Sequence, residues 1–296
     1  PPVRAAAVNA LMRLGCDGAI PAMGACLTDP QSIVREATVA AFCCMDVEIV
    51  AGTLLSLVGT PGFSPRIALT VARANPHRSY HPFIVTCLTD ASAPVRRSAV
   101  EALARQPTVD VVGTLEPLLR DADPDVRRAV VTILGGFRSR RVKQLLTNQA
   151  ETDPETVVDA VQALGRLGEA TVVPFLLALF EREKMPAKLA IIDVLKEIRD
   201  PATEPFLARQ LGSSDPALRR AAVLALGATR SPNAVRQVAS IARDPDETVR
   251  SAVATVLGGA ANAQAQDALA RLAHDPNRSI AALARQALEK LEPSGG

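Results

Sequence analysis

Two histidines have the spacing of a metal-binding pair. His77 and His81 lie four residues apart, which on a helix would bring both imidazoles to one side, and the only Tyr, Tyr80, lies between them. Pro76 and Pro82 flank the pair, and the sequence offers no evident third ligand. We therefore expect no metal and no cofactor here, and we treat Tyr80 and His81 as candidate contacts for a partner.

Cysteines are the other side chains that could bind a metal or carry redox chemistry. They are Cys16, Cys26, Cys43, Cys44 and Cys87. No two of them have CxxC spacing and their number is odd, which argues against a zinc site and against a disulfide framework. Cys43 and Cys44 follow the predicted core residue Phe42, where Cys is a small apolar filler. These features favour a reducing, cytoplasmic location.

A basic residue recurs along the chain and could contact phosphate. Alignment on a Val-Arg dipeptide followed by an Ala-rich segment gives one anchor position, occupied by Arg4, Arg35, Arg66, Arg96, Arg127, Val157, Lys188, Arg219, Arg250 and Ala281. An Asp precedes five of these anchors by six residues, at Asp29, Asp90, Asp121, Asp244 and Asp275. Because the Arg side chains can pair with these carboxylates, we expect a structural ladder rather than a nucleic-acid site.

The anchors are 30 or 31 residues apart, and such a regular period indicates a solenoid. Counted from the anchor, apolar residues recur at −1, +3, +6, +7 and +10, which is the stripe of an amphipathic helix. A second apolar helix lies upstream, and an Asp-Pro turn such as Asp123-Pro124 joins the two, with Asp as the cap. Gly at +8 comes late in this helix and is expected to help end it, in four units: Gly135, Gly165, Gly227 and Gly258.

Composition agrees with an all-α chain. Hydrophobic residues make up 48% of the 296 residues, aromatic residues only 3%, and Trp is absent, so the core must consist of Ala, Leu, Val and Ile. No apolar run is long enough for a transmembrane helix. We predict an α-α superhelix of about ten two-helix repeats in one domain, 1–296. Because the chain begins with Pro in the middle of a repeat, we expect it to be excised from a longer protein.

The repeat unit LxDxDPxVRxxAxxALG appears as LLRDADPDVRRAVVTILG at 118–135 and as IARDPDETVRSAVATVLG at 241–258. It resembles the short bacterial HEAT repeat, the phycobilisome-lyase type, over residues 2–291. The resemblance implies an α-solenoid that serves as a binding scaffold, with an Arg-Asp ladder between repeats and the second helices on the concave face.

On those second helices, positions +1 and +5 should point outward. Together these positions form one row of side chains along the concave face, the outward row. The candidate partner-binding residues there are Arg97, Glu101, Arg128, Thr132, Gln162, Leu189, Arg220 and Leu224. The same register assigns Ile67 and Val71 to the row in the third unit. This mixture of isolated apolar residues and Arg, without aromatic residues, suits a protein or peptide partner.

The third unit, 59–86, is the least regular. Arg73 falls on the +7 core position and the helix is cut short at Asn75-Pro76. Sequence rules often yield to function at such departures. A binding site and a structural bend both remain open.

Charge is uneven along the chain. Residues 96–143 carry ten basic and six acidic groups, whereas 144–204 carry six basic and eleven acidic groups. This alternation suits a partner of complementary polarity better than a long phosphate backbone. The basic run Arg138, Arg140, Arg141 and Lys143 is either a solvated turn or a docking patch for acidic protein or phosphate.

These observations predict a non-catalytic scaffold or regulatory domain that binds another protein, or another domain of the parent chain, on its concave face. Enzymes that resemble deoxyhypusine hydroxylase carry repeated His-Glu pairs, and those that resemble alkylpurine DNA glycosylases use Trp and Tyr; neither pattern is present. The alternatives are a chromophore-handling subunit similar to phycobilin lyases and a nucleic-acid-binding solenoid. The second would require aromatic residues on the concave row, and the row has none.

Overall fold

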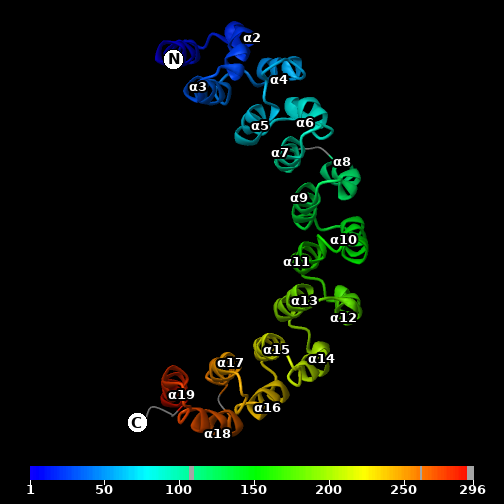
Figure 1. The fold of residues 1–296 in the computed structure, drawn as a ribbon, viewed down its shortest axis with the longest axis vertical. Coiled ribbons are helices and arrows are strands. Elements are labelled where there is room, and N and C mark those ends of the chain that lie inside the picture. The colour runs from blue at the N-terminus through cyan, green and yellow to red at the C-terminus, as the bar shows by residue number, and fades with distance from the viewer. Residues whose placement is uncertain (107–109, 261, 292–296) are drawn as a thin grey trace. The chain divides into compact units, whose positions relative to one another are not determined.

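The computed structural model describes residues 1–106, 110–260 and 262–291, and within them the chain forms 19 α-helices and no strand (Figure 1). The second helices of the repeats are α1 (Pro2–Arg13), α3 (Ser32–Phe42), α5 (Pro65–Ala74), α7 (Ala93–Leu103), α9 (Pro124–Leu134), α11 (Val157–Leu167), α13 (Met185–Ile198), α15 (Pro216–Thr229), α17 (Glu247–Leu257) and α19 (Arg278–Leu291). The first helices are α2 (Ile20–Gly24), α4 (Val47–Leu57), α6 (His81–Cys87), α8 (Val111–Leu115), α10 (Arg140–Thr152), α12 (Val173–Arg182), α14 (Glu204–Gln210), α16 (Pro232–Ser240) and α18 (Ala263–Leu272). The predicted all-α repeat architecture is confirmed.

The chain divides into two compact units, Pro1–Phe137 and Arg138–Gly296. Inside each unit, successive second helices pack side by side in one layer, from α1 to α9 and from α11 to α19, and the first helices form a second layer behind them (Figure 1). The continuity of a single solenoid through both units stays a prediction. No helix in the described part of the chain is long and apolar enough to cross a membrane.

The buried arc of each second helix is wider than the predicted stripe. Position +4, which the sequence pattern did not single out, is fully buried in four repeats, at Val100, Val131, Val161 and Val223. Each second helix packs against its own first helix and also against the second helices of the neighbouring repeats. Two of its faces are therefore buried away from water instead of one. Positions +1 and +5 lie outside this arc.

The Asp-Pro turns begin the second helices in more than one way. Asp123 and Asp215 cap α9 and α15 as predicted, with Pro at the first turn. At the turn before α17 the prediction was wrong, because this helix is capped by Asp246, two residues beyond Asp244. This leaves the Asp244 carboxylate available to a side chain of the preceding repeat.

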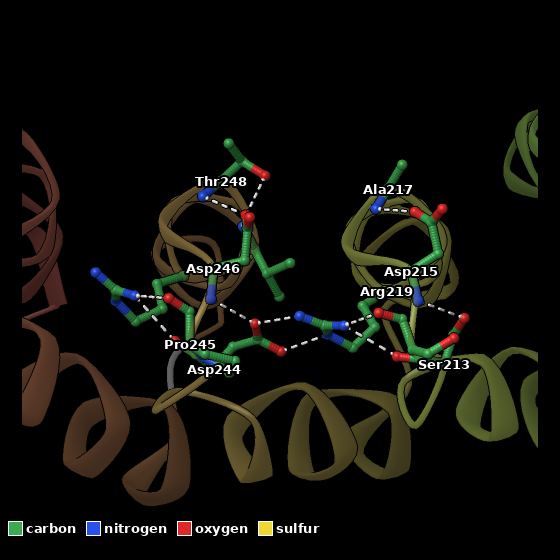
Figure 2. A network of polar contacts seen from close by, with 11 residues as sticks. Ser213, Asp215, Ala217, Arg219, Asp244, Pro245, Asp246 and Thr248 are labelled. Carbon is green, nitrogen blue, oxygen red and sulfur yellow. Dashed lines mark hydrogen bonds and ion pairs between the residues drawn. The ribbon is translucent and has the colours of Figure 1, made fainter.

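That side chain is the anchor Arg. Figure 2 shows the resulting set of hydrogen bonds between two successive turns, which we call a rung. Arg219 Nη1 donates to the carbonyl oxygens of Ser213 and Ser214 in its own turn, at 2.9 and 3.1 Å. Its Nε and Nη2 donate to both carboxylate oxygens of Asp244, 25 residues ahead, at 2.7 and 2.8 Å. The backbone N–H of Asp246 donates a further hydrogen bond to Asp244 Oδ1 at 2.9 Å. One guanidinium therefore joins two successive turns.

The same rung recurs elsewhere in both units. Arg4 pairs with Asp29, Arg96 with Asp121, and Arg250 with Asp275, each across 25 residues. The Arg96 guanidinium holds the pKa of Asp121 below its ordinary value, and Arg250 does the same for the pKa of Asp275. The anchor Arg residues of these rungs are thus used by the architecture, which confirms their structural role.

Gly at +8 ends the helix in two repeats, where Gly135 and Gly258 are the C-caps of α9 and α17, but the prediction was wrong for the other two. Gly165 and Gly227 lie inside α11 and α15, and neither has a positive φ. A Cβ atom at Gly165 would lie 2.6 Å from a methyl group of Val194 on the next second helix, and one at Gly227 would lie 2.6 Å from Val256. Glycine is therefore required by the close approach of adjacent second helices.

Replacing Gly227 by Ala tests this close approach. Ala is intrinsically better in a helix by about 1 kcal/mol, but the clash with Val256 should outweigh that gain and lower the free energy of unfolding by about 1–3 kcal/mol. The control is Gly52→Ala in α4, where a Cβ meets nothing within 4 Å, so that this change should stabilise the protein. Urea unfolding followed by circular dichroism would compare them, and stabilisation by both changes would contradict the packing explanation.

Asp275→Asn tests the rung through its pH dependence. Because the folded pKa of Asp275 is depressed, its contribution is complete above the ordinary value of 3.8 and is lost as the pH falls through the folded pKa. We expect the variant to be less stable than the wild type by about 2–3 kcal/mol at pH 7, and this gap to close in acid. The exposed Asp267, which has no polar partner within the described residues, provides the control Asp267→Asn. A gap that persists in acid would contradict the assignment.

Candidate partner-binding surface

Eight of the predicted partner-binding residues lie on five second helices, α7 to α15. Arg97, Arg128, Thr132, Gln162 and Arg220 are exposed. Glu101, Leu189 and Leu224 are partly exposed. The +1 and +5 positions thus face solvent as predicted, but their surroundings differ between the two units.

In α5 the predicted register is wrong by one residue. The buried residues are Ala68, Leu69, Val71 and Ala72, which match +3, +4, +6 and +7 only when Pro65 is the anchor. Arg66 and Thr70 therefore take the outward positions that had been assigned to Ile67 and Val71. The Val-Arg alignment missed this shift because the third unit has no Val-Arg dipeptide.

The corrected register also moves Arg73 out of the core. Its side chain is 40% exposed and pairs with Glu101 of the next repeat at 2.8 Å. Glu101 also lies 3.4 Å from Arg97 on its own helix. Two predicted binding residues, Arg97 and Glu101, thus form a charged cluster with Arg73 that connects α5 to α7.

A hollow of about 430 Å³ lies over this cluster, with Arg66, Asp123 and Asp125 also in its wall. Most of its charges are already engaged: Asp123 caps α9, and Asp125 pairs with Arg128. Basic and acidic groups are equal in number in the wall. The first-unit hollow is therefore nearly neutral and internally paired.

Tyr80 cannot contact a partner as predicted, because its side chain is fully buried at the start of the first helix α6. Burial raises the pKa of its hydroxyl, which has no hydrogen-bond partner within the described residues. His81 is partly exposed in the same layer, away from the second-helix row. His77 Nδ1 lies 3.0 Å from the Ser79 hydroxyl. The described residues hold no cluster of three or more potential metal ligands.

The basic run at the start of α10, from Arg138 to Lys143, is only partly used by the fold. Lys143 Nζ donates to Glu169 at 2.7 Å and to the Thr171 hydroxyl at 3.1 Å, which ties α10 to the next repeat and lowers the pKa of Glu169. Arg138 and Arg140 are exposed. The solvated-turn and docking-patch interpretations both stay predictions.

The second unit carries a longer depression, which we call the second-unit groove. It consists of two hollows of about 380 and 720 Å³ whose walls share Ala217, Arg220 and Leu224. The first hollow reaches back to Val158, Gln162 and Leu189 on α11 and α13. The second extends forward to Ile280 on α19. Four predicted binding residues thus line one groove across five second helices.

The charged residues in this groove are mostly paired. Lys196 forms an ion pair with Asp193, and Glu247 accepts a hydrogen bond from Asn277 at 2.8 Å. Arg220 is exposed and has no polar partner in the described part of the chain. It lies in the wall that both hollows share, and among the charged side chains of the groove it is the one without a polar partner in the described residues.

Comparison with protein families identifies the repeats. The family model for HEAT repeats matches residues 81–160, 119–195, 186–241 and 203–289, and that for the PBS lyase HEAT-like repeat matches residues 3–29. Comparison of the sequence with curated proteins gives no match.

Solved structures agree on the fold. The chain is similar to the Kap95:Nup1 complex, with 14% identity and a TM-score of 0.66 over 90% of this chain and 44% of that one. It is also similar to the AP-3 complex, with 16% identity and a TM-score of 0.58 over 91% of this chain and 55% of that one. Human deoxyhypusine hydroxylase in complex with glycerol matches at 21% identity, over 95% of this chain and 99% of that one, but with a TM-score of only 0.37. Since the HEAT-repeat matches cover well over half of the sequence, the chain belongs to the HEAT repeat family.

Proposed function

We propose that this chain is a non-catalytic HEAT-repeat scaffold that binds another protein, or another domain of its parent chain, on the second-helix layer. The observation that carries the proposal is the second-unit groove, which runs across five second helices and is lined by exposed or partly exposed side chains at the +1 and +5 positions. A groove of this length fits a macromolecular segment better than a small ligand, which proteins usually enclose on most sides.

The use of charge in the fold supports a scaffold over the alternatives. Four anchor Arg residues, which could have contacted phosphate, are instead bound to turn Asp residues in rungs. The second-helix row mixes Arg with acidic and apolar residues and carries no aromatic side chain for base stacking. We propose a cytoplasmic location, in keeping with five free cysteines.

Site-specific photo-crosslinking in cells that produce the protein tests the face used. A photoreactive amino acid is placed at the exposed Gln162 or Thr255 of the second-helix layer, and, as a matched control, at the exposed Arg236 or Gln264 of the first-helix layer. We expect discrete crosslinked species from the first pair of positions and none from the second pair. Crosslinks confined to the first-helix positions, or absent from both faces, would overturn the proposed binding face.

A further inference from the structure

We propose that the second-unit groove binds an extended segment of the partner in which an acidic side chain lies three residues from a large apolar one, with the carboxylate held by Arg220. This inference rests on the proposed function and adds the chemistry of the partner. Charge, apolar surface and spacing each contribute one step.

The charge of the groove is the first step. Asp193 forms an ion pair with Lys196, and Glu247 accepts a hydrogen bond from Asn277. Among the charged side chains of the groove, only Arg220 lacks a hydrogen-bond or ion-pair partner within the described residues. Its guanidinium can present two parallel N–H groups to a carboxylate. Since a hollow lies on each side of Arg220, a bound segment would pass directly over it and shield the ion pair from water.

The apolar surface next to Arg220 is the second step. Leu189 and Leu224 are partly exposed in the hollow between α13 and α15, together with Val158 of α11. In soluble proteins, apolar patches within a polar rim often mark interaction sites. These three side chains, on α11, α13 and α15, form an apolar site beside Arg220 with Leu189 of the neighbouring second helix at its centre, which a large apolar residue of the partner would fill.

Spacing is the third step. Packed helices lie about 8–10 Å apart, so Arg220 and the Leu189 site are separated by one such interval. A polyproline II chain rises about 3.1 Å per residue with three residues per turn, so its side chains i and i+3 point the same way about 9 Å apart. In a flat β-strand, by contrast, i and i+3 point to opposite sides. The match favours a polyproline II segment that runs across the helices.

A short peptide supplies the test. The probe is a fluorescein-labelled heptapeptide with blocked ends, Leu-Pro-Pro-Glu-Pro-Pro-Leu, whose prolines favour the polyproline II form. Binding to the whole chain is followed by fluorescence anisotropy. We expect saturable binding that weakens about tenfold or more when Glu is replaced by Gln in the peptide, or when Arg220 is replaced by Ala in the protein. Adding a Pro to each spacer should weaken binding as well.

A double-mutant cycle assigns the contact. If Arg220 holds the carboxylate, combining Arg220→Ala with the Gln peptide should cost no more than either change alone. Arg220→Glu should lose the Glu peptide and bind a Lys peptide of the same length. The matched control is Arg236→Ala on α16, an exposed Arg outside the groove, which should bind like the wild type. Circular dichroism confirms that each variant is folded.

The result that overturns the inference is distinct from failure of the scaffold proposal. Absence of binding up to about 1 mM, or binding that Arg220→Ala leaves unchanged, rules out the acidic segment at this site. In that case crosslinks from Gln162 and Thr255 would still support a scaffold whose partner has other chemistry.

Discussion

The rung between successive turns is the interaction on which the rest of the structure depends. A repeat of two short helices cannot bury its apolar faces alone, so the rotation of each second helix must be fixed by its neighbours. The Arg219 guanidinium does this by binding carbonyl oxygens of its own turn and the Asp244 carboxylate of the next. The side chains of this pair are only 11% and 5% exposed, so each charge would be costly without the other.

The irregular third unit lacks such a rung at its start. The residue 25 positions after Arg35 is Thr60, which cannot complete a rung, and α5 in this same unit is shifted by one residue. Its orientation depends on apolar packing and on the Arg73–Glu101 ion pair instead. The shift brings Arg66 onto the outward row beside Arg97, so a departure from the repeat changes the surface as well as the core.

Features that recur in every repeat could be predicted from the sequence. Features that depend on a single contact between two repeats could not. The period and the apolar stripe predicted the helices, their order and the outward row from Arg97 to Leu224. The burial of Val131 depends on packing between second helices, which a single-helix pattern does not contain. The role of Gly227 is likewise set by Val256 in another repeat. Tyr80 was a candidate contact because it lies between His77 and His81, but its side chain is buried in the core.

The first-unit hollow and the second-unit groove differ in which charged side chains remain without an intramolecular partner. Around the first-unit hollow, Glu101 lies between Arg73 and Arg97, so a partner would have to displace internal ion pairs to use either Arg. In the second-unit groove, Asp193 and Lys196 satisfy each other and Arg220 stays available. Recognition of an anion costs least where the cation is already exposed and unpaired. The architecture that holds the anchors Arg219 and Arg250 in rungs thus leaves Arg220, the next residue after Arg219, available to a partner.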